Sequence, residues 1–435
     1  MDMADGPTPR SHARARRLLE KRRDIVVHPD NALEDDSAAS PVPHHYYRPG
    51  ELLVRNDAGQ ADAFERVAHQ LGLDHRRRED HGRPKLRGKA RELASPLPSA
   101  ARYHVFSDDP LEDVLCRLED HAHGDFEVTP NHVLFGLELW GMDPYGDPRP
   151  PAAGEEGQTH LTGDGAGVTV AVVDSGLPRG YEANDLLKDN VETWLSEEEP
   201  WDYAGETPVL VSPQGHGSFV AGVVRQSAQN ATVQSYRVLD SDGVTDEWYL
   251  GNQLALVLGS GARVINLSLG ATTRAEAKLM GLSALEAAAK GQSVGRAPIV
   301  VAAAGNLGDF RKIWPAADDW TIGVGAVQLT GPDKKDPVPA PFSNRGHWVD
   351  VCTNGVDILS SFEAKRFQGS SAPEKIQQFH GKALWSGTSF AAPRVSGKVA
   401  EILQSSPNLD RHGVLAQLKA LGGSRGIEDL GWYVP

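Results

Sequence analysis

The chain has 435 residues, 40% of them hydrophobic, and a formal net charge of −15 at pH 7. Because one hydrophobic core usually stops growing at roughly 250 to 300 residues, we expect two domains, and the acidic balance argues against nucleic acid as a partner. No apolar run approaches the roughly 18 residues that a membrane-spanning helix requires, so the sequence predicts a soluble protein with no membrane partner.

Two features of the sequence indicate the compartment. The N-terminal residues include no apolar stretch of the kind found in secretory signals. Cys116 and Cys352 lie far apart in the chain, which favours neither a disulfide framework nor a metal-ligand cluster. Both features predict a cytoplasmic protein.

The first 140 residues divide into a tail and a small domain. Residues 1–44 combine a basic stretch with an acidic, small-residue segment that offers little to bury, which predicts a mobile tail. A short strand is expected at 51–55 and a second at 102–106. Each is followed by apolar residues at one-face helical spacing, namely Phe64, Val67, Ala68 and Leu71, and then Leu111, Val114, Leu115 and Leu118.

Further apolar segments within residues 126–135 add a strand to this alternation of strands and helices. Strands alternating with helices in this way predict a small ferredoxin-like α+β domain of the split βαβ type over residues 45–140. Residues 141–160 are dense in Pro and Gly without apolar periodicity, which predicts a linker.

Residues 161–435 are expected to form a single α/β domain. Near-continuous apolar runs alternate there with helical patterns, which is typical of a mostly parallel sheet with helices on both faces. The expected strands are 168–173, 232–239, 263–268, 298–304 and 321–327.

Three residues of this domain have side chains suited to nucleophilic catalysis. Asp174 ends the strand in "VTVAVVDSG", His216 lies between two glycines in "QGHGSFVAGVV", and Ser389 precedes a helical pattern in "SGTSFAAP". A serine hydroxyl becomes a nucleophile when a histidine takes its proton, and a buried carboxylate fixes that histidine's tautomer. Taken singly, the serine is more often a helix cap and the aspartate a turn residue. The coincidence of all three favours catalysis.

These three segments resemble the aspartate, histidine and serine motifs of the subtilases, the subtilisin-like serine proteases. The chain order Asp, His, Ser is also that of subtilisin. The resemblance extends over about 165–405. It implies a subtilisin-like fold and a serine endopeptidase acting through an acyl-enzyme, with Ser389 as nucleophile, His216 as general base and acid, and Asp174 orienting the imidazole.

The same resemblance assigns residues around the substrate. Asn306, at the end of "VVAAAGN", would donate to the oxyanion together with the backbone N–H of Ser389. A peptide substrate would pair with strand edges by β-augmentation, with residues 237–243 flanking the fourth pocket. The residues implied to line the cleft are Ser268, Leu269 and Gly270 on one side and Ala303, Ala304 and Gly305 on the other. The alternative is that these are ordinary buried strand ends.

Two positions depart from the family pattern. Cys352 stands in "CTNG", where the family usually has a small apolar residue and proline, and we expect a buried, inert thiol. The stretch after Asp174 matches a calcium-site segment only loosely. Asp185 would be its carboxylate, and one carboxylate is weak support for an ion that prefers six to eight oxygens. No cofactor is therefore required by the resemblance.

The segment "FEVTPNHVLFG" resembles the end of subtilase prodomains, which implies that residues 45–140 act as an intramolecular inhibitor. A permanent recognition domain is the alternative for this part. For the whole chain, the alternative to a protease is a latent protease-fold binding protein whose N-terminal domain recruits a partner. The linker over 141–160 is the expected processing region.

Overall fold

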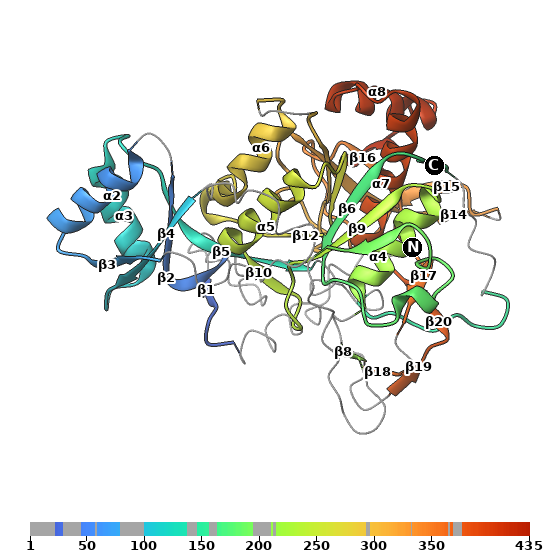
Figure 1. Ribbon diagram of the computed structural model, residues 1–435, viewed down its shortest axis with the longest axis horizontal. Coiled ribbons are helices and arrows are strands. Elements are labelled where there is room, and N and C mark those ends of the chain that lie inside the picture. Colours follow the sequence, from blue (N-terminus) through green and yellow to red (C-terminus); the bar gives the residue numbers. More distant parts are fainter. Residues whose placement is uncertain are drawn as a thin grey trace, which may run out of the picture.

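The computed structural model shows an N-terminal and a C-terminal domain connected by one long strand (Figure 1). Much of the predicted tail and of the predicted linker lies outside the described residues. The structure describes residues 22–28, 45–56, 59–78, 100–136, 146–155, 163–194, 210–211, 215–292, 296–331, 333–363, 366–368 and 376–435.

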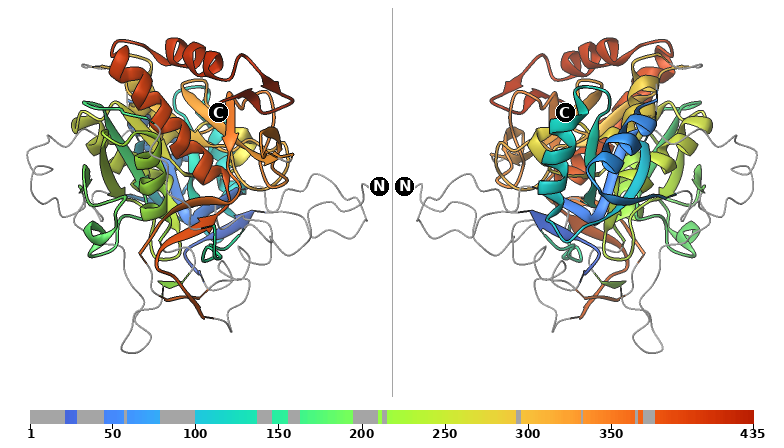
Figure 2. Two further views of the ribbon diagram at one scale, coloured as in Figure 1. Left: turned by 90° about the vertical axis from the view of Figure 1, so that its right-hand side faces the viewer. Right: turned by 90° about the vertical axis from the view of Figure 1, so that its left-hand side faces the viewer.

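The N-terminal domain is ferredoxin-like, as predicted. Its elements are β2 (His45–Arg55), α2 (Gln60–Gln70), β3 (Asp74–Arg77), β4 (Ala100–Phe106), α3 (Leu111–Ala122) and β5 (Val128–Gly136). The antiparallel strand order is β5-β2-β4-β3, and the two helices lie side by side on one face of the sheet (Figure 2, right). Phe64, Tyr103 and Leu118 are fully buried in the core between helices and sheet.

One short strand lies within the segment for which the sequence predicts a mobile tail. Strand β1 (Val26–His28) pairs antiparallel with β2, and Arg22 just before it makes ion pairs of 2.9 and 2.8 Å with Asp240 and Asp242. Residues 22–28 are thus part of the folded structure. The strand in this segment has only three residues, too few for a periodic apolar pattern to predict it.

The other face of the N-terminal sheet packs against the C-terminal domain. Leu53 and Ala100 form a buried cluster with Trp248 and Met280. The guanidinium of Arg102 lies 4.0 Å from the centre of the Trp248 ring, a cation–π contact. The two domains therefore share an apolar interface.

A mostly parallel sheet forms the centre of the C-terminal domain, as predicted. Its strand order is β21-β22-β16-β14-β13-β11-β6-β9-β7. Only β21 and the appended β15 are antiparallel to their neighbours. The strands are β6 (Thr169–Asp174), β7 (Val191–Thr193), β9 (Thr232–Arg237), β11 (Val264–Leu267), β13 (Ile299–Ala303), β14 (Thr321–Thr330), β15 (Asp336–Pro339), β16 (Val351–Asn354), β21 (Gly426–Ile427) and β22 (Gly431–Tyr433).

Helices cover both faces of this sheet, and each face has its own apolar core. Residues of α4 (His216–Ser227), α7 (Thr388–Ser405) and α8 (Arg411–Leu421) contribute to one core. Residues of α5 (Glu247–Gly259) and α6 (Ser283–Ala289) contribute to the other. The near-continuous apolar strands follow from this burial on both sides.

Short elements surround the sheet. They are β8 (Leu210–Val211), β10 (Val244–Asp246), β12 (Leu269–Gly270), β17 (Ile358–Phe362), β18 (Arg366–Gln368), β19 (Ile376–Gln378), β20 (Gly381–Trp385) and the 3₁₀ turns η3 (Tyr181–Ala183), η4 (Arg274–Glu276) and η5 (Met280–Leu282). In the part of the chain that the structure describes, no helix combines the length and apolarity needed to cross a bilayer.

Strand β5 connects the two domains. Its first half pairs with β2 in the N-terminal sheet, and its second half lies between β10 and β12 of the C-terminal domain (Figure 1). Part of the predicted linker is also held in place, because Arg149 exchanges two backbone hydrogen bonds of 2.9 Å with Leu384 of β20.

Candidate active site

The carboxyl edge of the parallel sheet carries the polar residues of the site. Strands β6, β11 and β13 are consecutive neighbours. Asp174 is the last residue of β6, Ser268 follows β11, and Asn306 comes shortly after β13. Because parallel strands end at the same edge, residues far apart in the sequence meet there, as is usual for ligand sites in such sheets.

Asp174 holds His216 in a defined orientation. The Nδ1 atom of His216 lies 2.8 and 3.0 Å from the two carboxylate oxygens of Asp174, and both side chains are fully buried. A carboxylate at Nδ1 keeps the proton there, which leaves Nε2 as the basic nitrogen. Helix α4 begins at His216 and approaches β6 closely. A Cβ on Gly217 would lie 2.4 Å from the carbonyl oxygen of Gly176, so only glycine fits.

Ser389 lies in the first turn of α7. The ring of Phe390, the next residue, lies with its centroid 5.3 Å from that of His216, so the start of α7 lies beside the histidine. The hydroxyl of Ser389 donates a 3.4 Å hydrogen bond to the carbonyl oxygen of Ser268. The cap position is Gly387, so Ser389 is not itself the helix cap. Pro393 cannot donate to the carbonyl of Ser389, which instead accepts a 2.9 Å hydrogen bond from Ser268 Oγ.

Asn306 is oriented by Thr388, a residue that the sequence motifs did not single out. The Oδ1 atom of Asn306 accepts hydrogen bonds from the backbone N–H of Thr388 at 2.9 Å and from its Oγ1 at 2.8 Å. Thr388 Oγ1 in turn accepts from the N–H of Gly305 at 3.1 Å. A Cβ on Gly387 would lie 3.3 Å from Asn306 Nδ2, so this donor faces the start of α7.

The predicted cleft-lining strand edge is present and is occupied by β5. Leu269 and Gly270 of β12 pair antiparallel with Gly136 and Phe135. On the other side of β5, Val244–Asp246 of β10 pairs with residues 133–135, and the N–H of Gly136 donates to the carbonyl of Gly243 at 2.9 Å. The segment predicted to flank the fourth pocket thus lies directly before β10.

The residues predicted for the opposite wall lie at the end of β13. Ala303 and Ala304 are fully buried in the sheet. Gly305 has a φ of 107°, and a Cβ there would lie 2.6 Å from Ile313 Cγ1. A larger residue than glycine would therefore displace this wall.

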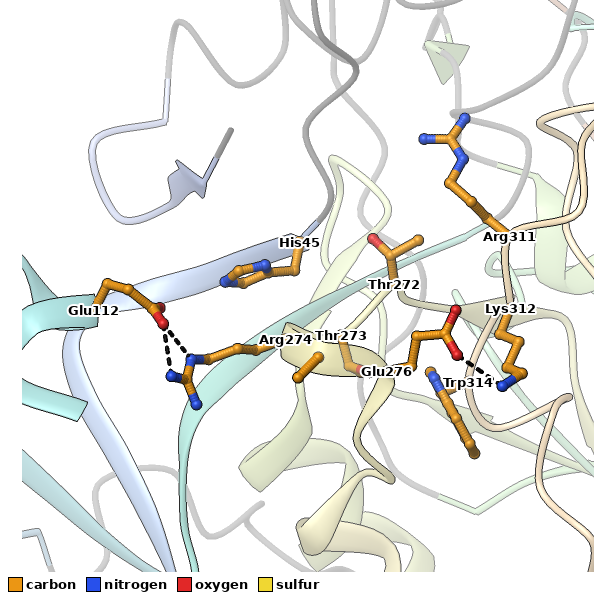
Figure 3. A pocket seen from close by; sticks show the side chains of 10 residues that line it. His45, Glu112, Thr272, Thr273, Arg274, Glu276, Arg311, Lys312 and Trp314 are labelled. Carbon is orange, nitrogen blue, oxygen red and sulfur yellow. Dashed lines mark hydrogen bonds and ion pairs between the residues drawn. The ribbon is translucent and has the colours of Figure 1, made fainter. Parts of the chain in front are cut away.

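Charged contacts hold the N-terminal domain over the cleft. Arg274 donates to Glu112 and Glu119 of α3 at 2.6 Å each, and Figure 3 shows its side chain reaching from the C-terminal domain to Glu112. Beside it, a cavity of about 330 Å³ is bordered by residues of both domains, including His45 and Trp314. The motifs did not reveal Arg274, because it pairs only through the fold.

The two departures from the family pattern have different outcomes. Cys352 is fully buried, and burial raises the pKa of its thiol to about 12, as expected for an inert cysteine. Asp185 is exposed and pairs with Lys188 at 3.0 Å. Among the described residues, no group of three or more His, Cys, Asp or Glu side chains could hold a metal ion.

Comparisons with known proteins agree with this geometry. A family model described as the subtilase family matches residues 165–421. The chain is 31% identical to a thermophilic serine proteinase of Bacillus sp. strain AK1 over 258 residues, which are 57% of this chain and 55% of that protein. It is 28% identical to thermitase of Thermoactinomyces vulgaris over 287 residues, or 64% of this chain and 86% of thermitase. The first of these matches spans little more than half of the relative's length.

A solved structure extends the likeness to both domains. The crystal structure of fervidolysin from Fervidobacterium pennivorans, a keratinolytic enzyme related to subtilisin, superposes with a TM-score of 0.58 at 19% identity, covering 94% of this chain and 62% of that one. At this identity the likeness concerns the fold alone. The family model covers more than half of the chain, and the chain therefore belongs to the subtilase family of serine peptidases.

Proposed function

We propose that the protein is a serine endopeptidase that acts on protein or peptide substrates and is held latent by its own N-terminal domain. The observation that carries the proposal is the buried His216–Asp174 pair beside the start of α7, which carries Ser389, together with an extended strand that pairs with the predicted cleft edges. The cytoplasm is the proposed site of action, supported by two cysteines that are both free.

His216 moves the protons in the reaction, Ser389 supplies the nucleophile and Asp174 supports the histidine. His216 Nε2 takes the proton of Ser389 as Oγ forms a bond to the substrate carbonyl carbon, and the imidazolium then donates that proton to the departing amine as the C–N bond breaks. Water, deprotonated by His216, next attacks the ester, and the proton returns to Ser389 Oγ as the acyl group leaves. Asp174 stabilises the imidazolium throughout.

Charge on the substrate carbonyl oxygen is stabilised by donors fixed in advance. Asn306 Nδ2 and the backbone N–H of Ser389 are the proposed pair, and Thr388 keeps the amide of Asn306 from rotating. Such preorganised donors usually supply a large part of the catalysis of acyl transfer.

Latency follows from the position of β5. A substrate strand would need the same edges of β10 and β12 that β5 now occupies. The strand edges that would pair with a peptide backbone are thus already paired with β5. This pairing supports the inhibitor role over a permanent recognition role.

Labelling with a fluorophosphonate probe tests the proposal, because the probe reacts with activated serines. The full-length protein, its Ser389→Ala variant and a Glu112→Gln/Glu119→Gln variant with weakened domain docking are compared by intact mass. An adduct on the docking variant and none on Ser389→Ala is expected. If neither the wild type nor the docking variant is labelled, the protease assignment fails and the protease-fold binding protein becomes the better description.

A further inference from the structure

Strand β5 provides a view of how a peptide lies in the cleft. It runs toward Ser389, because its last residue, Gly136, pairs with Leu269, and the residue before Leu269 contacts Ser389. Side chains alternate along a strand, so His132, Leu134 and Gly136 share one face. Leu134 belongs to the buried apolar cluster of the C-terminal domain. His132 therefore also projects toward this domain.

His132 is recognised there by two groups of the C-terminal domain. Its Nδ1 lies 2.7 Å from Oε2 of Glu247, the first residue of α5, and both side chains are fully buried. Its Nε2 accepts a 3.1 Å hydrogen bond from the backbone N–H of Arg274. The other oxygen of Glu247, Oε1, accepts from the N–H of Gly281 at 2.8 Å. Every polar atom of the pair thus has a partner.

This arrangement fits one kind of side chain. The N–H of Arg274 can only donate, so Nε2 of His132 carries no proton and Nδ1–H donates to Glu247. The partner must donate and accept through two atoms on opposite sides of a small ring. A hydrocarbon side chain would leave a buried carboxylate oxygen and an N–H without partners. A lysine offers donors but no acceptor for Arg274.

We propose that Glu247 and the backbone N–H of Arg274 form a subsite of the cleft that selects histidine, four residues before the position of Gly136, both in β5 and in substrates. The part of this inference that concerns substrates rests on the proposed function, whereas the recognition of His132 in β5 does not. It assigns to Glu247 a role in specificity, and it explains why the strand that fills the cleft carries His132 beside the apolar Leu134.

The recognition of His132 by Glu247 and Arg274 is tested in the full-length chain by an experiment that requires no catalytic activity. In a Ser389→Ala background, His132→Phe, His132→Gln, Glu247→Gln and the pair His132→Phe/Glu247→Gln are compared by hydrogen exchange of the backbone amides in 244–246 and 269–270. His121→Phe, at an exposed position on α3, is the matched control.

Exchange should be roughly 10- to 100-fold faster in His132→Phe, because a buried carboxylate loses its donor. His132→Gln, which keeps a donor and an acceptor but cannot place them on opposite sides of a ring, should lie between wild type and His132→Phe. Glu247→Gln should also open the cleft, since one amide oxygen cannot serve both Gly281 and His132. In that background, His132→Phe should add less than about threefold. Equal exchange in wild type and His132→Phe, or equal effects of His132→Phe in both backgrounds, would overturn the subsite.

The substrate half is tested with a peptide library and the Glu112→Gln/Glu119→Gln chain. Histidine should be enriched at one fixed distance upstream of the cleaved bond, and Glu247→Gln should remove that enrichment. Cleavage without enrichment refutes selection in substrates. If no peptide is cleaved while the exchange results hold, the proposed function fails and the recognition of His132 stands.

Discussion

Thr388 fixes the side-chain amide of Asn306 by donating two hydrogen bonds to its Oδ1 atom, one from the backbone and one from the hydroxyl. Since one end of the amide is held as an acceptor, the other end, Nδ2, is directed as a donor toward the start of α7. The proposed oxyanion donor is thus set by the residue next to the proposed nucleophile.

Replacing Thr388 by valine tests this arrangement. The assay uses the Glu112→Gln/Glu119→Gln chain, in which domain docking is weakened. There Thr388→Val keeps the shape of the side chain but removes the hydroxyl bond to Asn306, so we expect kcat to fall roughly 10- to 100-fold. KM should change little, because the loss affects only the state in which the oxyanion forms. Thr388→Ser retains the hydroxyl and should recover most of kcat. Equal kcat in the two variants would contradict the positioning role.

Removing the charges opposite Arg274 should open the cleft. In Glu112→Gln/Glu119→Gln the partly buried guanidinium loses both carboxylates, and we expect fluorophosphonate labelling of Ser389 to be about tenfold faster than in wild type. Glu127→Gln is the matched control, since Glu127 pairs with Arg55 inside the N-terminal domain. A labelling rate that responds equally to both changes would argue against a clamp at Arg274.

Stability should depend on pH through Asp318. Burial raises the pKa of this carboxyl to about 7, against 3.8 in its ordinary state. Between these values the folded protein holds a proton that the unfolded chain has lost, so the free energy of unfolding should decrease as the pH rises from about 4 to 7. Each unit of pKa difference corresponds to about 1.4 kcal/mol. Thermal unfolding of Asp318→Asn should show a flatter pH profile over this range.

The neighbouring Asp319 provides a control of opposite sign. The hydrogen bond from Lys278 lowers the pKa of Asp319, so its charged form stabilises the fold above the unfolded pKa and that contribution is lost as the pH falls. Asp319→Asn should therefore be less stable than wild type near pH 7. Identical pH profiles for the two variants would be inconsistent with these assignments.

The two cysteines should differ in reactivity. Cys116 is exposed, whereas Cys352 is buried with a raised thiol pKa. Iodoacetamide at pH 8 should add one group to the native protein and a second only after unfolding, as measured by intact mass. Native Cys116→Ser should remain unmodified. An adduct on that variant would place Cys352 within reach of solvent.

The sequence predicted those parts whose local pattern is dictated by burial or by chemistry. The strands ending near Asp174 and Asn306 are apolar because both faces of the sheet are covered, and His216 and Ser389 stand among small residues that permit close approach. The structure brings these predicted residues together at one edge. Their catalytic roles stay predictions until the variants are assayed.

Other features arise only from long-range pairing. Strand β3, with the sequence "DHRR", has no apolar pattern because it lies at the edge of its sheet, where charged residues are usual. The pairs His132–Glu247 and Arg274–Glu112 join residues more than a hundred positions apart. The sequence around each of these four residues has no pattern that indicates its partner, so only the folded chain reveals the two pairs. The cytoplasmic location also remains a prediction.

The shared strand β5 has a consequence for the protein's behaviour in solution. Its first half is the edge strand of the N-terminal sheet, beside β2. Its second half pairs with the edges of β10 and β12 in the C-terminal domain. When the two domains part, β5 stays paired with β2, but its second half and the edges of β10 and β12 all lose their partners at once, and unpaired strand edges are templates for self-association. The closed chain is therefore also the form least prone to aggregate, and storage of the protein should be safest before activation.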